Sequence, residues 1–503
     1  MNRFIEIPLC ALLLLIGALA LFTRENRFPF YYHQDEPGKV RQVQSGEWNF
    51  HHPMLLLGST RLAAGALGEE GRDPQRLAEV GRWVSATFAA AAAALLMAAT
   101  WLLAGRFAGW TAGALLLTNH QLFELAHYFK EDTALLFGVA FWFFALVLYW
   151  RKGGWGTAAL LALGAALAAS GKTLGLFTLP LSLLLIPWRQ PREKRLAAAV
   201  LAGAVFLLTF AAINFPALRE LASARASFER ELDLAVGGQG GLTRSIPHSV
   251  YLTALRVNVI FVLWFGMAWY YYRRCWRERA ALSPAEWTFA LFPILYLVIL
   301  SFAPKTNDRY FLPATALFLC AAAIGIAQFR DWLRPRLSER HWRWATAGLL
   351  LVAIGAQFPY KGMIRYYRAF RSDDTADLVR WLNTELPAGA TIAMDGKVMI
   401  ARSEDDADDQ PYLPRLKATV VDLDDYEDRD ALRKAGVTHL VLSESVYGRY
   451  RLKSLRPKAG AKAGYDRRKA FYADLLSAEP LWSRKRNTVI YLHPGLEVYR
   501  LEP

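Results

Sequence analysis

Long apolar segments recur through residues 1–358, and each is close to the roughly 20 residues that cross a bilayer as a helix. Hydrophobic side chains make up 54% of the 503-residue chain, which is more than an ordinary soluble protein carries. The sequence therefore predicts a polytopic α-helical membrane protein with about eleven transmembrane helices. The predicted spans are residues 4–22, 84–103, 110–125, 134–150, 153–169, 174–188, 196–213, 250–272, 287–302, 311–329 and 344–358.

The loops between these spans alternate in charge, and the chain as a whole carries a net charge of +15. With the N-terminus in the cytoplasm, the basic loops 189–195, 273–279 and 330–343 all fall on the cytoplasmic side, as the positive-inside rule requires. An odd number of spans then places the C-terminus outside. We therefore expect an integral protein of a bacterial inner membrane, whose basic loops contact anionic membrane lipids and not nucleic acid.

The first apolar segment ends in Ala18-Leu19-Ala20, which resembles a signal-peptidase site. The segment is long for a signal core, and cleavage would leave the acidic residues that follow it on a free end. We expect the segment to be retained as the first span. Two long outer loops are then predicted, at residues 23–82 and 214–249.

Residues 359–503 are far more polar than the preceding part of the chain. We expect them to form a separate extracytoplasmic α/β domain of ordinary size, after a transmembrane domain of residues 1–358. Apolar residues at helical spacing and short β-branched runs indicate its elements. These are a helix at 375–385, strands at 418–421 and 438–442, and a hairpin of 489–492 and 496–500 around Pro494-Gly495.

The sequence leaves the requirement for a metal open. The three cysteines lie in or beside apolar segments, so we expect neither a disulfide framework nor a thiolate metal site. Two acidic runs of the C-terminal domain, 404–409 and 422–430, could bind a divalent ion, although such runs are more often solvated loops. No other cofactor is expected.

Charged residues of both signs gather in the loops on the outer side, opposite the basic loops. Asp35 and Glu36 are adjacent carboxylates directly after the first span, where charge is costly to hold without a reason. A single residue of this kind is more often a solvated charge at a helix end, but both signs on one face favour a site. The set comprises the acids Asp35, Glu36, Glu131 and Asp132, the bases Lys172, Lys305 and Arg309, and the histidines His33, His51, His52 and His127.

Transfer of a sugar from a lipid phosphate requires this mixture of charges. A carboxylate takes the proton from an acceptor hydroxyl as the hydroxyl attacks the anomeric carbon of the sugar. Cations stabilise the negative charge that builds up on the departing phosphate, and lysine and arginine suit that task. We therefore expect Asp35, Asp132, Lys172 and Lys305 to converge in one cavity that opens outward.

Several short motifs follow one another in a fixed order through residues 1–360. They are Asp35-Glu36, His52-Pro53-Met54-Leu55, Arg82-Trp83-Val84-Ser85, His127-Tyr128-Phe129-Lys130-Glu131-Asp132, Lys172, and Lys305 with Arg309-Tyr310-Phe311-Leu312-Pro313. In order and spacing this set resembles the GT-C glycosyltransferases of the protein mannosyltransferase and lipid A aminoarabinose transferase type, which use polyprenyl-phosphate sugars. The C-terminal domain resembles the outer domain of that family in position and class.

The resemblance implies a role for each residue of the set. Asp35 would be the catalytic base, and Asp132 a second acid that positions the acceptor or a metal. Glu36 is placed with the catalytic acids, and a structural or metal-facing role is its alternative. Lys172, Lys305 and Arg309 would bind the donor phosphate. His52, Tyr128, Lys130 and Glu131 would contact the acceptor or shape the site.

Two departures from the family pattern bear on the identity of the sugar or of the acceptor, and not on the class of enzyme. Lys130 stands where arginine is usual, or one residue off, and the first loop has His51-His52-Pro53 where many members have two prolines. The predicted function is inverting transfer of a sugar from a polyprenyl-phosphate donor to an envelope lipid, glycan or protein on the extracytoplasmic face. The alternatives are a transporter or flippase of lipid-linked sugars, which should carry mid-membrane charges and internal repeats, and a non-catalytic envelope assembly protein.

Overall fold

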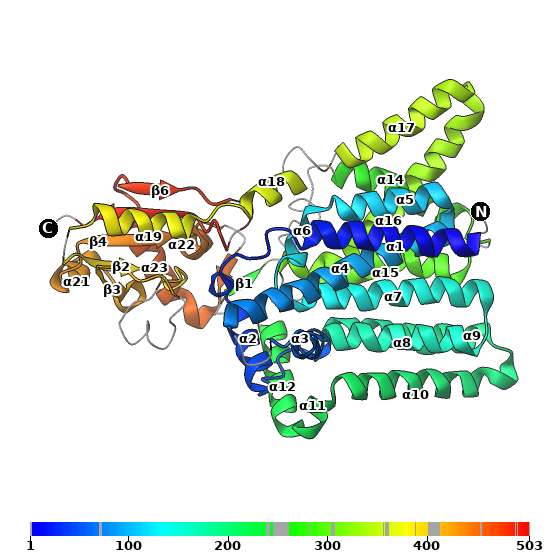
Figure 1. The fold of residues 1–503 in the computed structure, drawn as a ribbon, viewed down its shortest axis with the longest axis horizontal. Helices are drawn as coiled ribbons and strands as arrows, with labels where there is room; N and C mark the ends of the chain where they lie inside the picture. Colours follow the sequence, from blue (N-terminus) through cyan, green and yellow to red (C-terminus); the bar gives the residue numbers. More distant parts are fainter. Residues whose placement is uncertain are drawn as a thin grey trace. The chain divides into compact units, whose positions relative to one another are not determined.

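The structure of the protein is a computed structural model with two compact units. It describes residues 3–69, 73–237, 242–244, 261–279, 281–302, 307–355, 357, 362–387, 389–400, 413–452, 455–487, 489 and 491–501. The helical unit comprises Met1–Arg27, Asp35–Val236 and Ile246–Met363, and the α/β unit comprises Phe28–Gln34, Gly237–Ser245 and Ile364–Pro503. Figure 1 shows their elements.

Nearly all of the described part of the helical unit is helix, because its apolar segments must satisfy their own backbone hydrogen bonds in a bilayer. Its main helices are α1 (Arg3–Phe22), α2 (Glu36–Ser45), α3 (Leu55–Ala66), α4 (Pro74–Ala104), α5 (Arg106–Leu117), α6 (His120–Ala126), α7 (Glu131–Lys152), α8 (Trp155–Gly171), α9 (Thr178–Arg189), α10 (Arg195–Ile213), α11 (Phe215–Arg219), α12 (Leu221–Gly237), α14 (Phe261–Arg277), α15 (Pro284–Ser301), α16 (Leu312–Leu333) and α17 (Glu339–Gly355). Short 3₁₀ turns precede α9, α10 and α16 and follow α16: η2 (Thr173–Phe177), η3 (Arg192–Lys194), η4 (Asp308–Phe311) and η5 (Arg334–Arg336).

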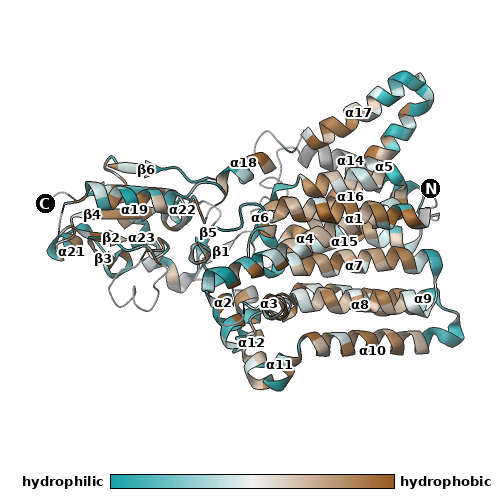
Figure 2. Ribbon diagram, in the orientation of Figure 1, coloured by the Kyte–Doolittle hydropathy of each residue, from teal (hydrophilic) through white to brown (hydrophobic). Residues whose placement is uncertain are grey.

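The prediction of a polytopic helical membrane protein is confirmed. Within the described residues, six helical segments are long and apolar enough to cross a membrane, and Trp155–Gly171 and Thr173–Arg189 are apolar but shorter. Apolar residues run along the long helices of this unit, drawn in brown in Figure 2. The six segments are Ile5–Phe22, Pro74–Ala104, Glu131–Lys152, Arg192–Ile213, Pro284–Ser301 and Asp308–Arg336.

The segment expected as a third continuous span, 110–125, is broken into α5 and α6. Asn119 lies between the two helices, and its side-chain oxygen accepts a hydrogen bond from the backbone N–H of Leu122 at 3.0 Å. An asparagine that caps a new helix in this way competes with continuation of the previous one. Part of another predicted span, residues 250–260, lies outside the described residues.

Helix α4 is the centre of the helical unit and packs against α1, α5 and α7. Helices α7 and α8 pack against each other along an extensive interface, and glycines allow their backbones to approach closely. A methyl group on Gly138 of α7 would overlap the backbone of Ala168, and one on Gly171 would lie 2.6 Å from the backbone nitrogen of Leu135. Small residues at such an interface let helix backbones approach closely in a membrane, and here they bring the end of α8 against the start of α7.

The α/β unit is built on a mixed five-stranded sheet of order β3-β2-β4-β7-β6. Strands β3, β2 and β4 are parallel, whereas β7 pairs antiparallel with both β4 and β6. The strands are β2 (Thr391–Met394), β3 (Thr419–Asp422), β4 (His439–Ser443), β6 (Trp482–Arg484) and β7 (Leu496–Arg500); β1 (Leu242–Arg244) and β5 (Leu455–Pro457) form a separate antiparallel pair. The helices are α18 (Met363–Ala369), α19 (Asp374–Glu385), α21 (Arg429–Lys434), α22 (Glu444–Arg451) and α23 (Lys462–Leu475).

Helices cover both faces of this sheet, as a parallel sheet requires. Leu378 and Leu382 of α19 pack in one apolar cluster with Ile392 and Val441. The cluster of the other face contains Leu432 of α21, Val446 and Tyr447 of α22, Phe471, Tyr472 and Leu475 of α23, and Leu440 and Leu442 of β4.

The helix expected at 375–385 and the strands expected at 418–421 and 438–442 are present within one residue as α19, β3 and β4. The expected hairpin is wrong, because β7 pairs with β6 and not with 489–492. Backbone hydrogen bonds from Leu492 and His493 to the carbonyl of Val489 make that segment a turn.

Candidate active site

The start of α7 is the centre of a cluster of charged side chains in the helical unit. Lys130 is the N-cap residue of α7, and Glu131 and Asp132 lie in its first turn. Carboxylates are favoured there because unpaired backbone N–H groups give a helix N-terminus a partial positive charge. All three residues are buried; Lys130 and Glu131 form ion pairs with Asp35 and Lys39 at the start of α2, and Asp132 forms one with Lys172.

Asp35 combines a fixed position with access to solvent. It is the N-cap residue of α2, and its Oδ2 forms an ion pair with the Nζ of Lys130. The Lys130 side chain is only 3% exposed, whereas that of Asp35 is 46% exposed. Burial lowers the pKa of Lys130 to about 7; the nearby Arg309 and Lys172 also lower it, and Glu131 and Asp132 raise it. A buried cation thus anchors a carboxylate that a ligand can reach.

Glu36 has a different environment from its neighbour. Its side chain is fully buried, and its two carboxylate oxygens accept hydrogen bonds from Arg82 Nε at 3.1 Å and Nη2 at 2.5 Å. One of these oxygens also accepts the backbone N–H of Phe129 at 2.8 Å. These bonds connect α2, α4 and the segment before α7. The geometry supports the structural alternative for Glu36 and gives no support to a catalytic role.

Glu131 is held between two basic groups of the first outer loop. Its Oε1 forms an ion pair with Nζ of Lys39, and its Oε2 lies 4.0 Å from Nε2 of His52. Burial lowers the pKa of Lys39 and lowers the pKa of His52 to about 4, so the imidazole is neutral at pH 7. Glu131 and Lys39 are therefore a buried pair, and His52 is the more exposed of the groups beside it.

Asp132 pairs with two of the residues predicted to bind phosphate. The Nζ of Lys172 donates a hydrogen bond to its Oδ1 at 2.6 Å, and Arg309 Nε lies 3.7 Å from its Oδ2. The Lys172 side chain is 8% exposed and that of Arg309 is 22% exposed. Arg309 is therefore the more accessible of the two. Lys305, the third predicted phosphate ligand, lies outside the described residues.

Hydrogen bonds from neighbouring helices fix the turn that carries Arg309. The side-chain amide of Gln121 donates to the backbone oxygen of Asp308 at 2.7 Å, and the hydroxyl of Tyr296 donates to that of Tyr310 at 3.2 Å. The ring of Tyr310 lies 4.3 Å from the Nζ of Lys172. This cation–π contact holds the lysine and the turn together.

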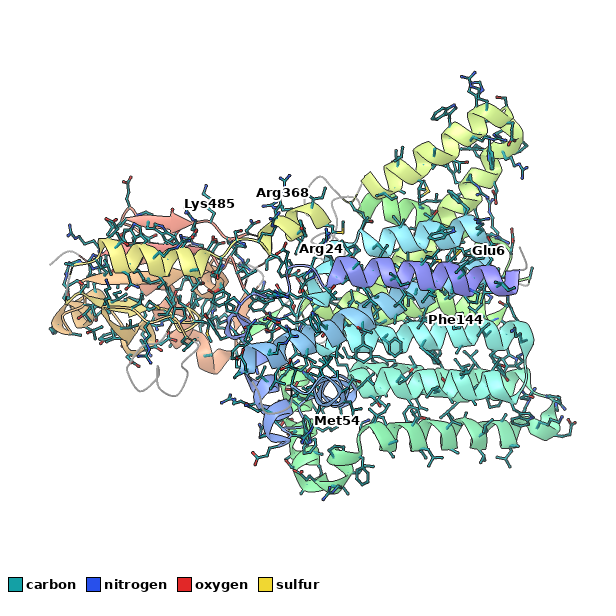
Figure 3. The ribbon with its side chains drawn as sticks, in the orientation of Figure 1. Glu6, Arg24, Met54, Phe144, Arg368 and Lys485 are labelled. Atoms are coloured by element: carbon teal, nitrogen blue, oxygen red, sulfur yellow. The ribbon has the colours of Figure 1, made fainter. Side chains whose placement is uncertain are left out.

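The first outer loop is tied to the same region by Asn214, directly after α10. Its Oδ1 accepts the backbone N–H of Met54 at 2.9 Å, and its Nδ2 donates to the hydroxyl of Ser170 at 2.9 Å. Met54 is labelled in Figure 3. Ser170 lies two residues before Lys172. The loop that carries His52 and the turn that carries Lys172 are therefore connected through one buried amide.

The described cluster has a small excess of positive charge, and each of its carboxylates faces a cation. Lys39, Lys130, Lys172 and Arg309 face Asp35, Glu131 and Asp132. No group of three or more His, Cys, Asp or Glu suited to a metal ion occurs among the residues that the structure describes. Each of these three carboxylates has a cationic partner. The first acidic run, 404–409, lies outside the described residues.

The structure thus brings Asp35, Lys130, Glu131, Asp132, Lys172, Arg309 and His52 into one network. Tyr128 is buried, and its hydroxyl lies 3.5 Å from Oε1 of Glu124 in α6. Lys39 was not predicted. It lies four residues after Asp35, on the same side of α2, and that spacing is the signal that could have found it.

Comparison with known proteins finds structural likeness only. No family model matches the sequence, and no curated protein matches it. The apo form of the oligosaccharyltransferase of Archaeoglobus fulgidus superposes with a TM-score of 0.50 at 12% identity, over 88% of this chain and 70% of that chain. ArnT of Cupriavidus metallidurans bound to undecaprenyl phosphate gives a TM-score of 0.49 at 14% identity, over 99% of this chain and 98% of that chain.

The oligosaccharyltransferase match covers most of both chains. An identity this low establishes the fold and leaves the reaction to be argued from the site. The chain has the GT-C glycosyltransferase fold that its motifs indicated.

Proposed function

We propose that the protein is a membrane glycosyltransferase that transfers a sugar from a polyprenyl-phosphate donor to an envelope lipid, glycan or protein. The observation that carries the proposal is the half-exposed Asp35 carboxylate, held by the buried Lys130 in a cluster that also contains Arg309. The GT-C fold supports it, because an oligosaccharyltransferase shares that fold. The donor class follows from the resemblance of the motifs.

In the proposed reaction Asp35 accepts the proton of an acceptor hydroxyl. The hydroxyl oxygen forms a bond to the anomeric carbon of the sugar, and the bond from that carbon to the phosphate oxygen breaks. Polyprenyl phosphate leaves with the electron pair. Because one displacement from the face opposite the phosphate occurs, the configuration at the anomeric carbon inverts.

Arg309 is proposed to bind the phosphate, because it is the most exposed cation of the cluster. The positive excess of the cluster stabilises the charge that grows on the leaving phosphate. Lys172 acts mainly by fixing Asp132, to which it donates a hydrogen bond at 2.6 Å. Asp132 in turn orients the guanidinium of Arg309. His52, which is neutral, is available for a hydroxyl of the acceptor.

The proposed site faces the outside, and residues 359–503 are proposed to be extracytoplasmic. A cysteine in place of the exposed Asp430 should react with an impermeant thiol reagent added to intact cells. The three native cysteines are buried, so the background labelling is low. Labelling only after the membrane is permeabilised would show that residues 359–503 lie in the cytoplasm, opposite to the proposed orientation.

The proposed reaction is tested with the purified protein in lipid nanodiscs and a radiolabelled polyprenyl-phosphate sugar. Mass spectrometry of envelope extracts from cells with and without the protein identifies the acceptor, which is then added to the assay. Release of polyprenyl phosphate together with a product of inverted anomeric configuration is the expected result. Movement of the intact donor across the bilayer without cleavage would instead identify a flippase, and neither cleavage nor movement would identify an assembly protein.

A further inference from the structure

The segment that directly precedes Asp35 belongs to the α/β unit. The chain leaves α1, contributes Phe28–Gln34 to that unit, and returns to the helical unit at Asp35. Every residue of 30–33 is buried, although this part of the loop is only a single 3₁₀ turn, η1 (Phe30–Tyr32). Burial of so many aromatic side chains in a short loop shows that the loop is packed against other parts of the chain.

Contacts with residues of the α/β unit hold this segment. The ring of Phe28 stacks on that of Phe370 with the centroids 5.6 Å apart. The hydroxyl of Tyr32 donates a hydrogen bond to Oδ2 of Asp373 at 2.7 Å. The ring of His33 lies 4.1 Å from that of Tyr491.

The residues that receive the segment are themselves fixed. Asp373 is the N-cap of α19, and its Oδ1 accepts the backbone N–H of Ala376 at 2.9 Å. Beside it, Nδ1 of His493 lies 2.9 Å from a carboxylate oxygen of Asp374, and Nε2 of His493 lies 2.8 Å from the backbone oxygen of Ala369. The two oxygens of Asp373 thus connect the start of α19 to the segment before the base.

We propose that Tyr32 and Asp373 are positioning residues through which the α/β unit restricts the placement of Asp35. The inference rests on the proposed function, since it treats Asp35 as the base. Asp35 follows Tyr32 by three residues, and three residues of extended chain reach about 10 Å at most. A general base must lie within hydrogen-bonding distance of the proton it removes, so a tether this short limits the positions of the carboxylate.

The test compares substitutions that break the contact with a matched loss of a helix cap elsewhere in the same unit. Tyr32→Phe removes the hydroxyl and keeps the ring, and Asp373→Ala removes both the contact and the cap. Asp373→Asn keeps an oxygen that can cap α19, and its amide nitrogen can donate a hydrogen bond to the hydroxyl oxygen of Tyr32 in place of the bond that Tyr32 donates to Asp373. Asp428→Ala is the control, because Asp428 caps α21 through the N–H of Ala431 at 2.8 Å.

Turnover and donor KM are measured in full-length protein in nanodiscs, with hydrogen–deuterium exchange of the peptide that spans residues 28–36. Tyr32→Phe and Asp373→Ala should lower kcat about tenfold, since small misplacement of a catalytic group is costly, and should leave the donor KM unchanged. Both should speed exchange in residues 28–36, whereas Asp373→Asn and Asp428→Ala should behave as wild type.

Two outcomes would overturn the positioning role. One is wild-type kcat for Tyr32→Phe, with wild-type exchange in residues 28–36. The other is an equal loss of kcat in Asp428→Ala, which would show that any loss of a cap in the unit has this effect. Failure of the proposed function is distinguishable, because the wild type would then transfer no sugar, while the exchange results would still report on the Tyr32–Asp373 contact.

Discussion

Buried carboxylates occur in both units, but they are stabilised in opposite ways. In the helical unit, Glu131 and Asp132 face ammonium and guanidinium groups. In the α/β unit, Asp395 is fully buried at the end of β2, and the hydrogen bonds to its oxygens come from the hydroxyl of Tyr472 and the backbone N–H of Ser443, each at 2.6 Å.

The two arrangements have different consequences for charge. A carboxylate that faces a cation keeps its charge in the protein interior, although removing both ions from water is costly. Burial raises the pKa of Asp395 to about 7, and the hydrogen bonds from Tyr472 and Ser443, together with the nearby Arg468, offset this only partly. Charge is therefore retained where the proposed reaction needs it, and it is disfavoured where the carboxylate serves the fold. Substitutions in the two regions should differ accordingly.

The largest effect is expected for Asp35→Asn, which keeps the shape of the side chain and removes its capacity to accept a proton. Turnover should fall by about 10² to 10⁴, while donor binding persists. Radiolabelled sugar transfer and donor binding are measured on the same purified protein. Asp233→Asn, at an exposed carboxylate of α12, is the control. Near-full transfer by Asp35→Asn would show that another carboxylate is the catalytic base.

A smaller loss is expected for Arg309→Gln, which removes the accessible cation of the cluster. The charge of the donor phosphate is present in the bound state and grows in the transition state, so both donor binding and turnover should weaken, by about 10- to 100-fold in kcat/KM. Arg343→Gln, at an exposed arginine of α17, should have no effect. If Arg309→Gln lowers only the yield of folded protein and leaves kcat/KM unchanged, Arg309 is a structural partner of Asp132 and does not bind the donor.

The Asp35–Lys130 pair should also give the reaction a pH limit. Because burial lowers the pKa of Lys130 to about 7, its ammonium loses a proton as the pH rises through that value and no longer holds Asp35. Activity should therefore fall on the alkaline side of pH 7. Lys130→Arg, which stays charged, should move that limit upward by about one pH unit or more. An unchanged pH–rate profile in this variant would show that another group sets the limit.

The smallest effect on activity is expected for Asp395→Asn, which should change only the pH dependence of the free energy of unfolding. The folded-state pKa of about 7 lies above the value of roughly 3.9 in an unfolded chain, so the folded state binds the proton more tightly between these values. This contribution to stability is fully present below about pH 4 and is lost as the pH rises through about 7. The variant should lack this part of the pH dependence.

Thermal unfolding of the full-length protein in detergent, followed at pH 5 and pH 8, measures this effect. The wild type should lose more stability between the two values than Asp395→Asn does. Sugar transfer at a permissive temperature should be equal in the two proteins. A loss of transfer in Asp395→Asn would contradict the division of roles between the two regions.

The sequence predicted the elements that depend on local pattern. The apolar segments predicted the helical unit, the spacing of Leu378 and Leu382 predicted α19, and the chemistry of Asp35 with Lys130 to Asp132 predicted the centre of the cluster. These features are encoded within a few residues or by one charge pattern. They therefore need no knowledge of which segments pack together.

What the sequence missed depends on contacts between distant segments. Nothing near Glu36 shows that it pairs with Arg82, 46 residues away. The pairing of β7 with β6 was missed because Pro494-Gly495 has the composition of a hairpin turn while the chain around it forms a different turn. The assignment of Phe28–Gln34 to the α/β unit depends on Asp373, which is 341 residues after Tyr32.

The partners of Lys130, Glu131 and Asp132 lie on both sides of α7 in the sequence, which has a consequence for biogenesis. During synthesis, Asp35 and Lys39 precede α7, so the partners of Lys130 and Glu131 are already present when α7 emerges. Asp132 gains Lys172 40 residues later and Arg309 only when the start of α16 has been made. The nascent protein therefore carries Asp132 without either cation until α8 is complete, and Arg309, the proposed phosphate ligand, is the last part of the cluster to be made.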